Sequence, residues 1–567
     1  MRPTPPYLRL TTAALPHMDS HLDQTNTPAA ASWPHHRQAA REVLGTEGPW
    51  TLHGTQAARM IEREKLSQWP PGQLMAWAGR RTAGWALAQA PHARRIWVAV
   101  GPGGNGGDGL HAAMHLARLG KEVTLTLPFG DRSLRPDMQA LLQHALGAGC
   151  RVTHPPSAGG ADLVIDALLG LGASRPLDAS LAAAVRVINQ QPCPRLSVDL
   201  PTGLDADTGQ ALGGGWVQAH ATLSLLTLKP GLFMGIGRDA AGDIWFDPLD
   251  SSPLSGPIEP AAQTVAPPDR LQSAQPRLHA SHKGRFGDVI TVGGAPGMTG
   301  ALRLAARAAL AAGAGRVIVV PLNPSAPPDD GMRPECMWRP PEQLTDLPLE
   351  QATVVCGCGG GTEVDRWLPQ VLARSARLVL DADALNAVAR QPGLRQALQS
   401  RASRGQTSVL TPHPLEAARL LGCAVHEIQS DRLKAAAGLS SQFASTAVLK
   451  GSGTVIASPN RLPAINITGN GALATGGTGD VLAGWLAGRW SSATNLPDPS
   501  AVSSDAAPGE GTNGGAPTGL TAAWESARAH FVACEAVRLH GLAADLHGTR
   551  SALRASDLME RMHQLLG

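Results

Sequence analysis

A glycine-rich segment in the C-terminal half combines residue types that handle a phosphoryl group. The sequence NITGNGALATGGTGDVLAG spans residues 466–484 and leads into an apolar helical pattern, with Asp480 at the junction. Small residues let successive backbone N–H groups point into one space, and a helix N-terminus adds partial positive charge. Asp480 would face a phosphate bound there and could take a proton from a hydroxyl that attacks phosphorus. A helix cap after a flexible loop is the alternative interpretation.

A second glycine-rich segment, GPGGNGGDG, covers residues 101–109. It follows a predicted strand at 96–100 and precedes a predicted helix at 110–119, and this order is typical of a doubly wound α/β fold. Its G-x-G-x-x-G spacing is weak support by itself. An ordinary dinucleotide-binding fold would end its second strand with an acidic residue, and the strand predicted at 123–127 has none.

Acidic residues lie elsewhere in this half. Asp108 is inside the glycine loop, and Asp166 and Asp199 each end an apolar strand, the edge where open α/β sheets bind ligands. A turn or a helix cap is the alternative for each acid. Asn105, Asp166 and Thr202 together offer amide, carboxylate and hydroxyl oxygens. Hard cations prefer such donors, and one negative charge favours a monovalent ion. Asp199 would then be free to act as an acid or base.

The C-terminal half repeats the α/β pattern. Its sequence predicts a helix at 301–312 and strands at 289–292, 316–320, 352–356, 377–380 and 407–410. Asp381 and Asp383 follow one strand and could be catalytic carboxylates or helix caps. His413 lies between two prolines and could contact substrate or be structural. No G-x-x-x-x-G-K-[ST] motif is present, which excludes a Walker-type phosphate loop.

Composition limits the kind of protein. A chain of 567 residues is too long for one core and predicts two large domains. The net charge of +3 gives no reason to expect a nucleic-acid partner, so a small-molecule partner is expected. The seven cysteines are scattered and lack the spacing of a zinc site, so we read them as reduced thiols of a cytoplasmic protein. No apolar run of about 18 residues exists, and no membrane span is expected.

Composition also suggests boundaries. Residues 1–50 do not resemble a signal peptide and are predicted to be a disordered extension. The first domain is predicted at 51–250 and the second at 277–567, separated by a Pro- and Ser-rich linker at 251–276 that should make the halves separable. The segment 491–521 is of low complexity and is predicted to be an insertion.

Longer motifs carry a family resemblance. GPGGNGGDG, DALLGLGASRP and SVDLPTGLDADTG resemble the epimerase domain of the bifunctional NAD(P)H-hydrate repair enzymes. TPHPLEAARLLG, VLKGSGTVIASP and NITGNGALATGGTGDVLAGWLAG resemble the dehydratase domain of the same family, which belongs to the ribokinase-like superfamily. The resemblance implies a Rossmann-like three-layer sandwich followed by a ribokinase-like α/β domain.

The resemblance also implies two activities. The first domain would interconvert the R and S forms of hydrated NADH or NADPH (NADHX and NADPHX). The second would use ADP to dehydrate the S form to NAD(P)H, giving AMP and phosphate. An alternative is a ribokinase-like small-molecule kinase with a non-catalytic nucleotide-binding N-terminal domain.

Site residues of the first domain are carried over by position. Asp199 is implied as catalytic, and Asn105, Asp166 and Thr202 as ligands of K⁺. The implied substrate-binding positions are Gly104, Asn105, Gly106, Gly107, Asp108, Gly170, Leu171, Gly172, Ala173, Ser174, Arg175, Pro176 and Asp199. This chain departs from the family at Gly104, where an Asn is usual, and at Thr202, where a Ser is common. The change at Gly104 removes a side-chain amide, and we expect a weakened epimerase.

Site residues of the second domain follow in the same way. Asp480 is implied as catalytic. The implied hydrate-binding positions are Ala301, Gly359 or a neighbouring glycine of its loop, His413 and Asp480. The implied nucleotide-binding positions are Lys450, Gly451, Ser452, Gly453, Thr454 and Gly479. We expect ADP as co-substrate, Mg²⁺ in this domain and a homo-oligomeric state.

Overall fold

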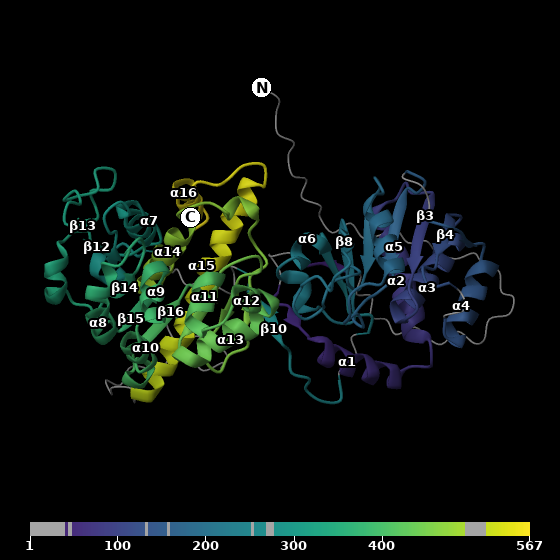
Figure 1. The fold of residues 1–567 in the computed structure, drawn as a ribbon, viewed down its shortest axis with the longest axis horizontal. Helices are drawn as coiled ribbons and strands as arrows, with labels where there is room; N and C mark the ends of the chain where they lie inside the picture. Colours follow the sequence, from purple (N-terminus) through teal and green to yellow (C-terminus); the bar gives the residue numbers. More distant parts are fainter. Residues whose placement is uncertain are drawn as a thin grey trace, which may run out of the picture. The chain divides into compact units, whose positions relative to one another are not determined.

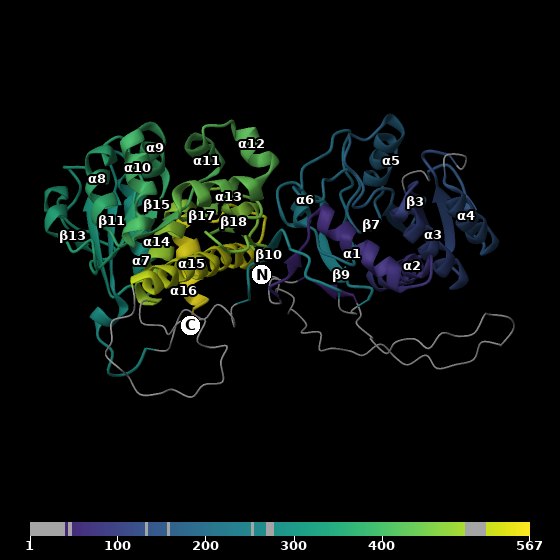
Figure 2. The ribbon, with the colours of Figure 1, turned by 90° about the horizontal axis from the view of Figure 1, so that it is seen from below.

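The structure is a computed structural model. It describes residues 40–43, 48–130, 134–155, 159–250, 254–267, 277–493 and 518–566, without the side chains of 518–522. Most of the predicted extension at 1–50, and residues 494–517 of the predicted insertion, lie outside the described residues. The described part contains two sheets with helices packed against them (Figures 1 and 2).

The first sheet has eight strands, and all neighbouring pairs are parallel except β1–β9. Its strands in spatial order are β1 (Arg41–Glu42), β9 (Asp243–Asp247), β8 (Ala221–Leu225), β7 (Arg195–Val198), β6 (Leu163–Ala167), β3 (Arg95–Val100), β4 (Glu122–Thr126) and β5 (Arg151–Val152). Its helices are α1 (Thr55–Gln68), α2 (Gln73–Gln89), α3 (Gly104–Arg118), α4 (Pro136–Gly147), α5 (Ala179–Asn189) and α6 (Gly237–Ala241).

The strands form because both faces of the sheet are buried. Along β3, Ile96 and Val98 pack in one hydrophobic cluster, whereas Trp97 and Ala99 pack in another. Alternate side chains of a strand point to opposite faces, so this near-continuous apolar run is what a doubly covered parallel sheet requires.

Helix α3 corrects a predicted boundary. It begins at Gly104, whereas the sequence predicted a start at 110. The glycine-rich sequence predicted a turn, but its small residues form the first turns of the helix. They allow this end of the helix to pack closely against the backbone at Gly101. A Cβ on Gly106 would lie 1.9 Å from the carbonyl oxygen of Gly101.

The second sheet has eleven strands, and those from β13 to β17 are parallel. In spatial order they are β13 (Met337–Trp338), β12 (Arg316–Pro321), β11 (Asp288–Gly293), β14 (Thr353–Cys356), β15 (Arg377–Leu380), β16 (Thr407–Leu410), β17 (Thr446–Leu449), β18 (Val455–Ala457), β19 (Ala464–Ile465), β10 (Ala262–Thr264) and β2 (Thr51–Leu52).

Helices accompany this sheet throughout. They are α7 (Thr299–Ala311), α8 (Val364–Arg374), α9 (Ala382–Arg390), α10 (Pro392–Gln399), α11 (Pro414–Leu421), α12 (Val425–Ser430), α13 (Arg432–Phe443), α14 (Thr478–Ser492), α15 (Thr518–His547) and α16 (Ala555–Gln564). Helices α7 and α14 lie side by side (Figures 1 and 2). The prediction of an α/β chain with parallel sheets is confirmed in both halves.

Two strands of the second sheet, β2 and β10, come from outside the predicted second domain. β10 lies inside the segment predicted as a linker, and it pairs with β19 on one side and with β2 on the other. Its Ala262 and Thr264 are fully buried, a short alternation that the surrounding prolines concealed in the sequence. One hydrophobic cluster also contains both Leu232 of the first half and Leu449 of the second. The two halves therefore share buried surface.

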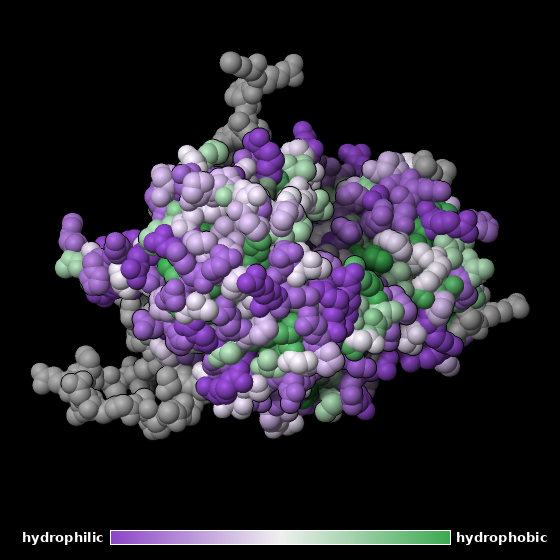
Figure 3. Space-filling view, turned by 60° about the vertical axis from the view of Figure 1, so that its left-hand side comes forward, coloured by the Kyte–Doolittle hydropathy of each residue, from purple (hydrophilic) through white to green (hydrophobic). Residues whose placement is uncertain are grey.

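The surface is polar where it is seen. On the face in Figure 3, hydrophilic residues dominate and hydrophobic ones form small separate areas. Among the described helices, none combines the length and hydrophobicity needed to cross a membrane.

Candidate active sites

The N-terminus of α14 forms the centre of the second-half site. Gly477 precedes the helix with a φ of 91°, and Asp480 lies in the first turn. A Cβ on Gly477 would lie 2.7 Å from Leu304 Cδ1, so glycine suits both the conformation and the packing. His540 Nε2 donates to the carbonyl oxygen of Thr478 at 3.0 Å and ties this turn to α15. The backbone amides of the turn are thus held in place.

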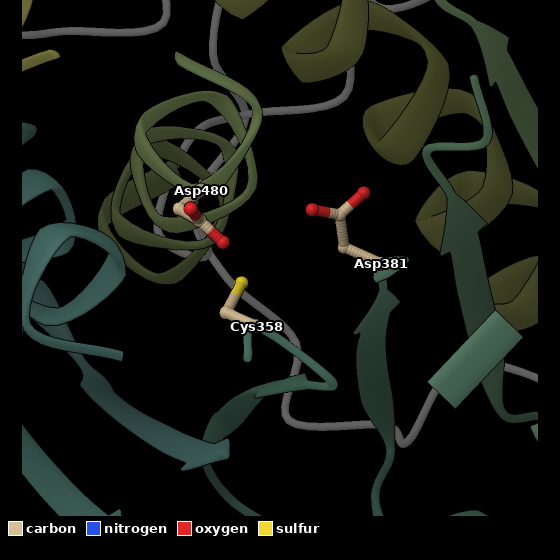
Figure 4. A group of neighbouring side chains, drawn as sticks. All are labelled: Cys358, Asp381 and Asp480. Carbon is tan, nitrogen blue, oxygen red and sulfur yellow. The ribbon is translucent and has the colours of Figure 1, made fainter. Parts of the chain in front are cut away.

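Two polar side chains lie beside Asp480. Cys358, from the loop after β14, and Asp381, from the end of β15, face it (Figure 4). Burial and the charge of Asp381 raise the pKa of Asp480 to about 6, although the Cys358 thiol and Lys450 act in the opposite direction. Burial and the neighbouring carboxylates raise the pKa of the Cys358 thiol well above its usual range. At neutral pH Asp480 is therefore mainly ionised and still basic enough to accept a proton.

Lys450 supplies the positive charge of this site. Its Nζ lies 2.7 Å from Asp381 Oδ1, which also accepts a hydrogen bond from Thr411 Oγ1 at 2.7 Å. Burial alone would lower the pKa of the Lys450 ammonium, but the carboxylates of Asp381 and Glu416 outweigh it and raise this pKa. A Cβ on Gly479 would lie 3.3 Å from Lys450 Nζ, so glycine there leaves room for the lysine.

This geometry resolves an alternative left open by the sequence. Asp381 stands at the N-cap of α9 but makes no capping hydrogen bond, and it binds Lys450 instead. Asp383 accepts a hydrogen bond from the Gly361 amide at 2.8 Å. Neither carboxylate caps α9, and Asp381 joins the site.

A cavity of about 600 Å³ adjoins the α14 N-terminus. Of the predicted nucleotide-binding residues, Lys450, Gly451, Ser452, Thr454 and Gly479 line it, and Gly453 does not. This volume lies within the ordinary range for small-molecule sites.

The start of the loop at 450–454 forms hydrogen bonds with a residue that the sequence analysis did not identify. The buried Arg432 donates through Nη2 to the carbonyl oxygens of Leu449 and Lys450, at 3.0 and 3.1 Å. No motif marks this arginine, because it supports the loop through backbone atoms.

Of the other predicted hydrate-binding residues, Ala301 and Gly359 are neighbours, whereas no hydrogen bond joins His413 to them in the described residues. A Cβ on Gly359, whose φ is 57°, would lie 3.0 Å from Ala301 Cβ, so these two positions are neighbours. His413 caps α11, its Nδ1 accepting from the amides of Leu415 and Glu416 at 3.1 and 3.3 Å. The structural alternative for His413 is thus observed, and its contact with substrate stays a prediction. Ala301, Gly359, His413 and Asp480 are not among the lining residues of the cavity.

In the first half, Asp166 is buried at the end of β6. Its carboxylate accepts hydrogen bonds from Ser197 Oγ, Thr202 N, Thr202 Oγ1 and Leu168 N, at 2.7 to 3.2 Å. Within the described residues no basic side chain forms an ion pair with Asp166. The predicted pair Asp166–Thr202 is therefore in contact. Burial raises the pKa of Asp166, although these hydrogen bonds act in the opposite direction.

Asn105, the third predicted ligand, lies beside Gly170. Its Oδ1 and Nδ2 are buried, and neither has a hydrogen-bond partner within the described residues. A Cβ on Gly170 would lie 3.3 Å from Asn105 Oδ1 and 3.0 Å from Asp199 Oδ2, so Gly170 stands between the two side chains. Unsatisfied buried amides are rare, and this one is free to bind a ligand.

Asp199 has a strained backbone, with a φ of 66°. Its Oδ2 accepts from the Leu171 amide at 3.2 Å, so the predicted turn at 170–176 starts beside it. Within that turn, Gly172, Ser174, Arg175 and Pro176 are exposed, whereas Leu171 and Ala173 are half-buried.

Two charged residues near Asp199 were not predicted. The buried Lys229 forms an ion pair with Asp199 and donates to the Leu225 carbonyl oxygen at 3.0 Å. Glu62 of α1 has a pKa raised by burial and by the charge of Asp199. Burial, Asp199 and Glu62 also raise the pKa of Asp108 well above its usual range. Lys229 follows a strand in the sequence, a detectable signal, whereas nothing in its spacing marks Glu62.

Comparison with known proteins agrees with this organisation. Residues 289–563 match a family described as NAD(P)H-hydrate dehydratase, and residues 71–231 match the YjeF-related protein N-terminus. The bifunctional NAD(P)H-hydrate repair enzyme Nnr of Escherichia coli is 38% identical over 73% of this chain and 79% of its own. The Nnr proteins of Coxiella burnetii and Vibrio cholerae are 34% and 31% identical, over 73% and 87% of this chain and 85% and 93% of theirs.

Among solved structures, the ADP/ATP-dependent NAD(P)H-hydrate dehydratase of Bacillus subtilis, co-crystallised with ATP/Mg²⁺, is 26% identical with a TM-score of 0.39. It covers 52% of this chain and 95% of its own. The identity and coverage of the curated relatives establish that the chain belongs to the family of bifunctional NAD(P)H-hydrate repair enzymes.

Proposed function

We propose that this protein repairs hydrated NADH and NADPH by epimerising their R and S forms and dehydrating the S form at the expense of ADP. The observation that carries the proposal is Asp480 at the N-terminus of α14, beside Lys450 and the adjoining cavity. The names of its relatives give the same substrate.

The dehydration is proposed to begin with transfer of the β-phosphoryl group of ADP. Asp480 takes the proton of the carbinol hydroxyl, whose oxygen attacks phosphorus, and AMP leaves as the phosphoanhydride bond breaks. The amides at the start of α14 stabilise charge on the transferred group. Phosphate then leaves with the carbon–oxygen electron pair, the ring nitrogen supplies electrons, and loss of a ring proton restores the reduced nicotinamide. Phosphate is a better leaving group than hydroxide, which explains the need for the nucleotide.

A resident Mg²⁺ does not fit the side chains beside Asp480. One ligand atom from each of Cys358, Asp381 and Asp480 lies within 4.8 Å of the others, but a thiol suits softer metals. Lys450 already neutralises Asp381. We therefore propose that Mg²⁺ arrives with the nucleotide, held mainly by phosphate oxygens and water, as is usual for this ion.

The epimerase site is proposed to bind K⁺. Asn105 offers an unpartnered buried oxygen, and Asp166 carries a buried charge without an ion-pair partner in the described residues. A monovalent cation would compensate this charge and hold the loop at 168–171. Asp199, paired with Lys229, is proposed to contact the hydrated ring. We also propose a cytoplasmic location, in keeping with seven free cysteines, and a homo-oligomeric state.

Recovery of reduced nicotinamide tests the proposal. Purified protein with ADP and hydrated NADH should restore the absorbance band of NADH and release AMP and phosphate in equal amounts. A stable phosphorylated product without NADH would instead favour an ordinary small-molecule kinase.

A further inference from the structure

A charged residue of the first half lies in the cavity of the second half. Arg238 belongs to α6, within the predicted epimerase domain, yet it lines the cavity beside Lys450 and Gly479. Its Nη2 donates to the carbonyl oxygens of Ile467 and Gly469, at 3.0 and 2.8 Å. Both acceptors belong to the second half, so Arg238 forms hydrogen bonds across the boundary between the two halves.

The segment around Arg238 is fixed against the loop predicted to bind nucleotide. The Gly235 amide donates to the Ser452 carbonyl oxygen, and Ser452 Oγ donates to that of Gly235, both at 3.1 Å. A Cβ on Gly453, whose φ is 66°, would lie 2.1 Å from the Phe233 carbonyl oxygen. These contacts bring the segment before α6 against the 452–453 loop, and Arg238 and Asp239 of α6 line the cavity.

Arg238 and Lys450 are the arginine and lysine that line the cavity, and they differ in their partners. Lys450 is paired with Asp381. Arg238 forms no ion pair in the described part of the chain. Burial lowers its pKa, although the charges of Asp545 and of Asp239, which also lines the cavity, act in the opposite direction. The two carbonyl acceptors occupy only Nη2, and a guanidinium has five N–H donors. An oriented guanidinium in a partly buried cavity favours an anionic ligand.

We propose that Arg238 is part of the nucleotide site of the dehydratase half, where its guanidinium binds the nucleoside diphosphate directly. The first half is then needed for tight nucleotide binding as well as for epimerisation. This inference rests on the proposed function, because it takes the occupant of the cavity to be ADP.

The test measures ADP binding by calorimetry on the full chain, without turnover. Arg238→Ala should weaken ADP binding roughly 10–100-fold, the usual effect of losing a charge-assisted hydrogen bond. Arg238→Gln keeps an amide donor for the carbonyls of 467 and 469 but lacks the charge, and it should weaken ADP binding to a similar extent. Arg186→Ala is the control, because this exposed side chain donates to the Ala182 carbonyl oxygen of its own helix α5, and it should leave ADP affinity within twofold.

Kinetics separate ligand contact from a purely structural role. The KM for ADP should rise in both Arg238 variants, while kcat at saturating ADP stays within about threefold and R-to-S conversion is unchanged. ADP affinity within twofold of wild type in both variants would overturn the inference. Wild-type affinity in Arg238→Gln alone would overturn it too, since Arg238 would then only hold the 467–469 loop. Binding of ADP without recovery of NADH would refute the proposed function but leave the inference standing, whereas wild-type protein that binds no ADP would refute both.

Discussion

Replacing Asp480 by Asn removes the proposed base while keeping its shape. We expect the dehydration rate to fall by about 10²–10⁴-fold, the usual contribution of a positioned general base. The pKa of about 6 also gives a pH signature in the wild type. The rate should be flat above pH 7 and about tenfold lower at pH 5, where about a tenth of Asp480 is ionised.

The same pKa predicts that the variant is at least as stable as the wild type. The folded-state pKa lies above the ordinary value of 3.8, so the wild type loses stability as pH rises from about 4 to about 6. The substituted asparagine carries no charge, and we expect the variant to gain about 1–3 kcal/mol at pH 7.5 after allowance for partial solvent access.

The assay is ADP-dependent recovery of NADH across pH 5–8, together with thermal unfolding of each variant. Asp365→Asn is the matched control, because Asp365 pairs with Arg390 on the surface, and it should keep wild-type activity. Near-wild-type turnover by a well-folded Asp480→Asn protein would remove Asp480 from the mechanism.

Further changes test the rest of the account. Gly104 is exposed and a Cβ there meets no atom within 4 Å, so Gly104→Asn should tighten binding of the hydrate by roughly tenfold or less, measured as KM for R-to-S conversion. Asn105→Ala should slow R-to-S conversion far more than any change at position 104. The loss should appear as a smaller difference between the rates in potassium and in sodium. A fragment beginning at Ala274 lacks β2, β10 and Arg238, so its melting temperature and ADP affinity should fall below those of the full chain; equal values would show that the halves are independent. Replacing residues 494–517 with a short Gly/Ser loop should leave activity and melting temperature almost unchanged, and a large loss of either would contradict the predicted insertion.

The sequence predicted the longer parallel strands of the second half because they are continuous apolar runs. β15 and β16 lie at the predicted residues, 377–380 and 407–410. The start of α3 was missed because four glycines in the first six helical residues read as a turn, and only packing against neighbouring loops makes them helical. β10 was missed because three residues of strand among prolines give no periodic signal.

The site residues also divide into those that the sequence could identify and those that it could not. Asp480, Asp166 and Thr202 could be found because they lie in motifs that resemble those of a known family. Glu62 and Arg238 could not be assigned, since their surroundings depend on which segments meet in space. Arg238 is 229 residues from its acceptor in Ile467, and no spacing rule connects such positions.

The most direct test of the central claim is the reaction of S-hydrated NADH with purified protein and ADP, followed by NADH absorbance and by product analysis. The account predicts one NADH, one AMP and one phosphate for each ADP consumed, with the rate lowered by about 10²–10⁴-fold in Asp480→Asn. ADP consumption that leaves the hydrate phosphorylated, or NADH recovery at equal rate without any nucleotide, would contradict it.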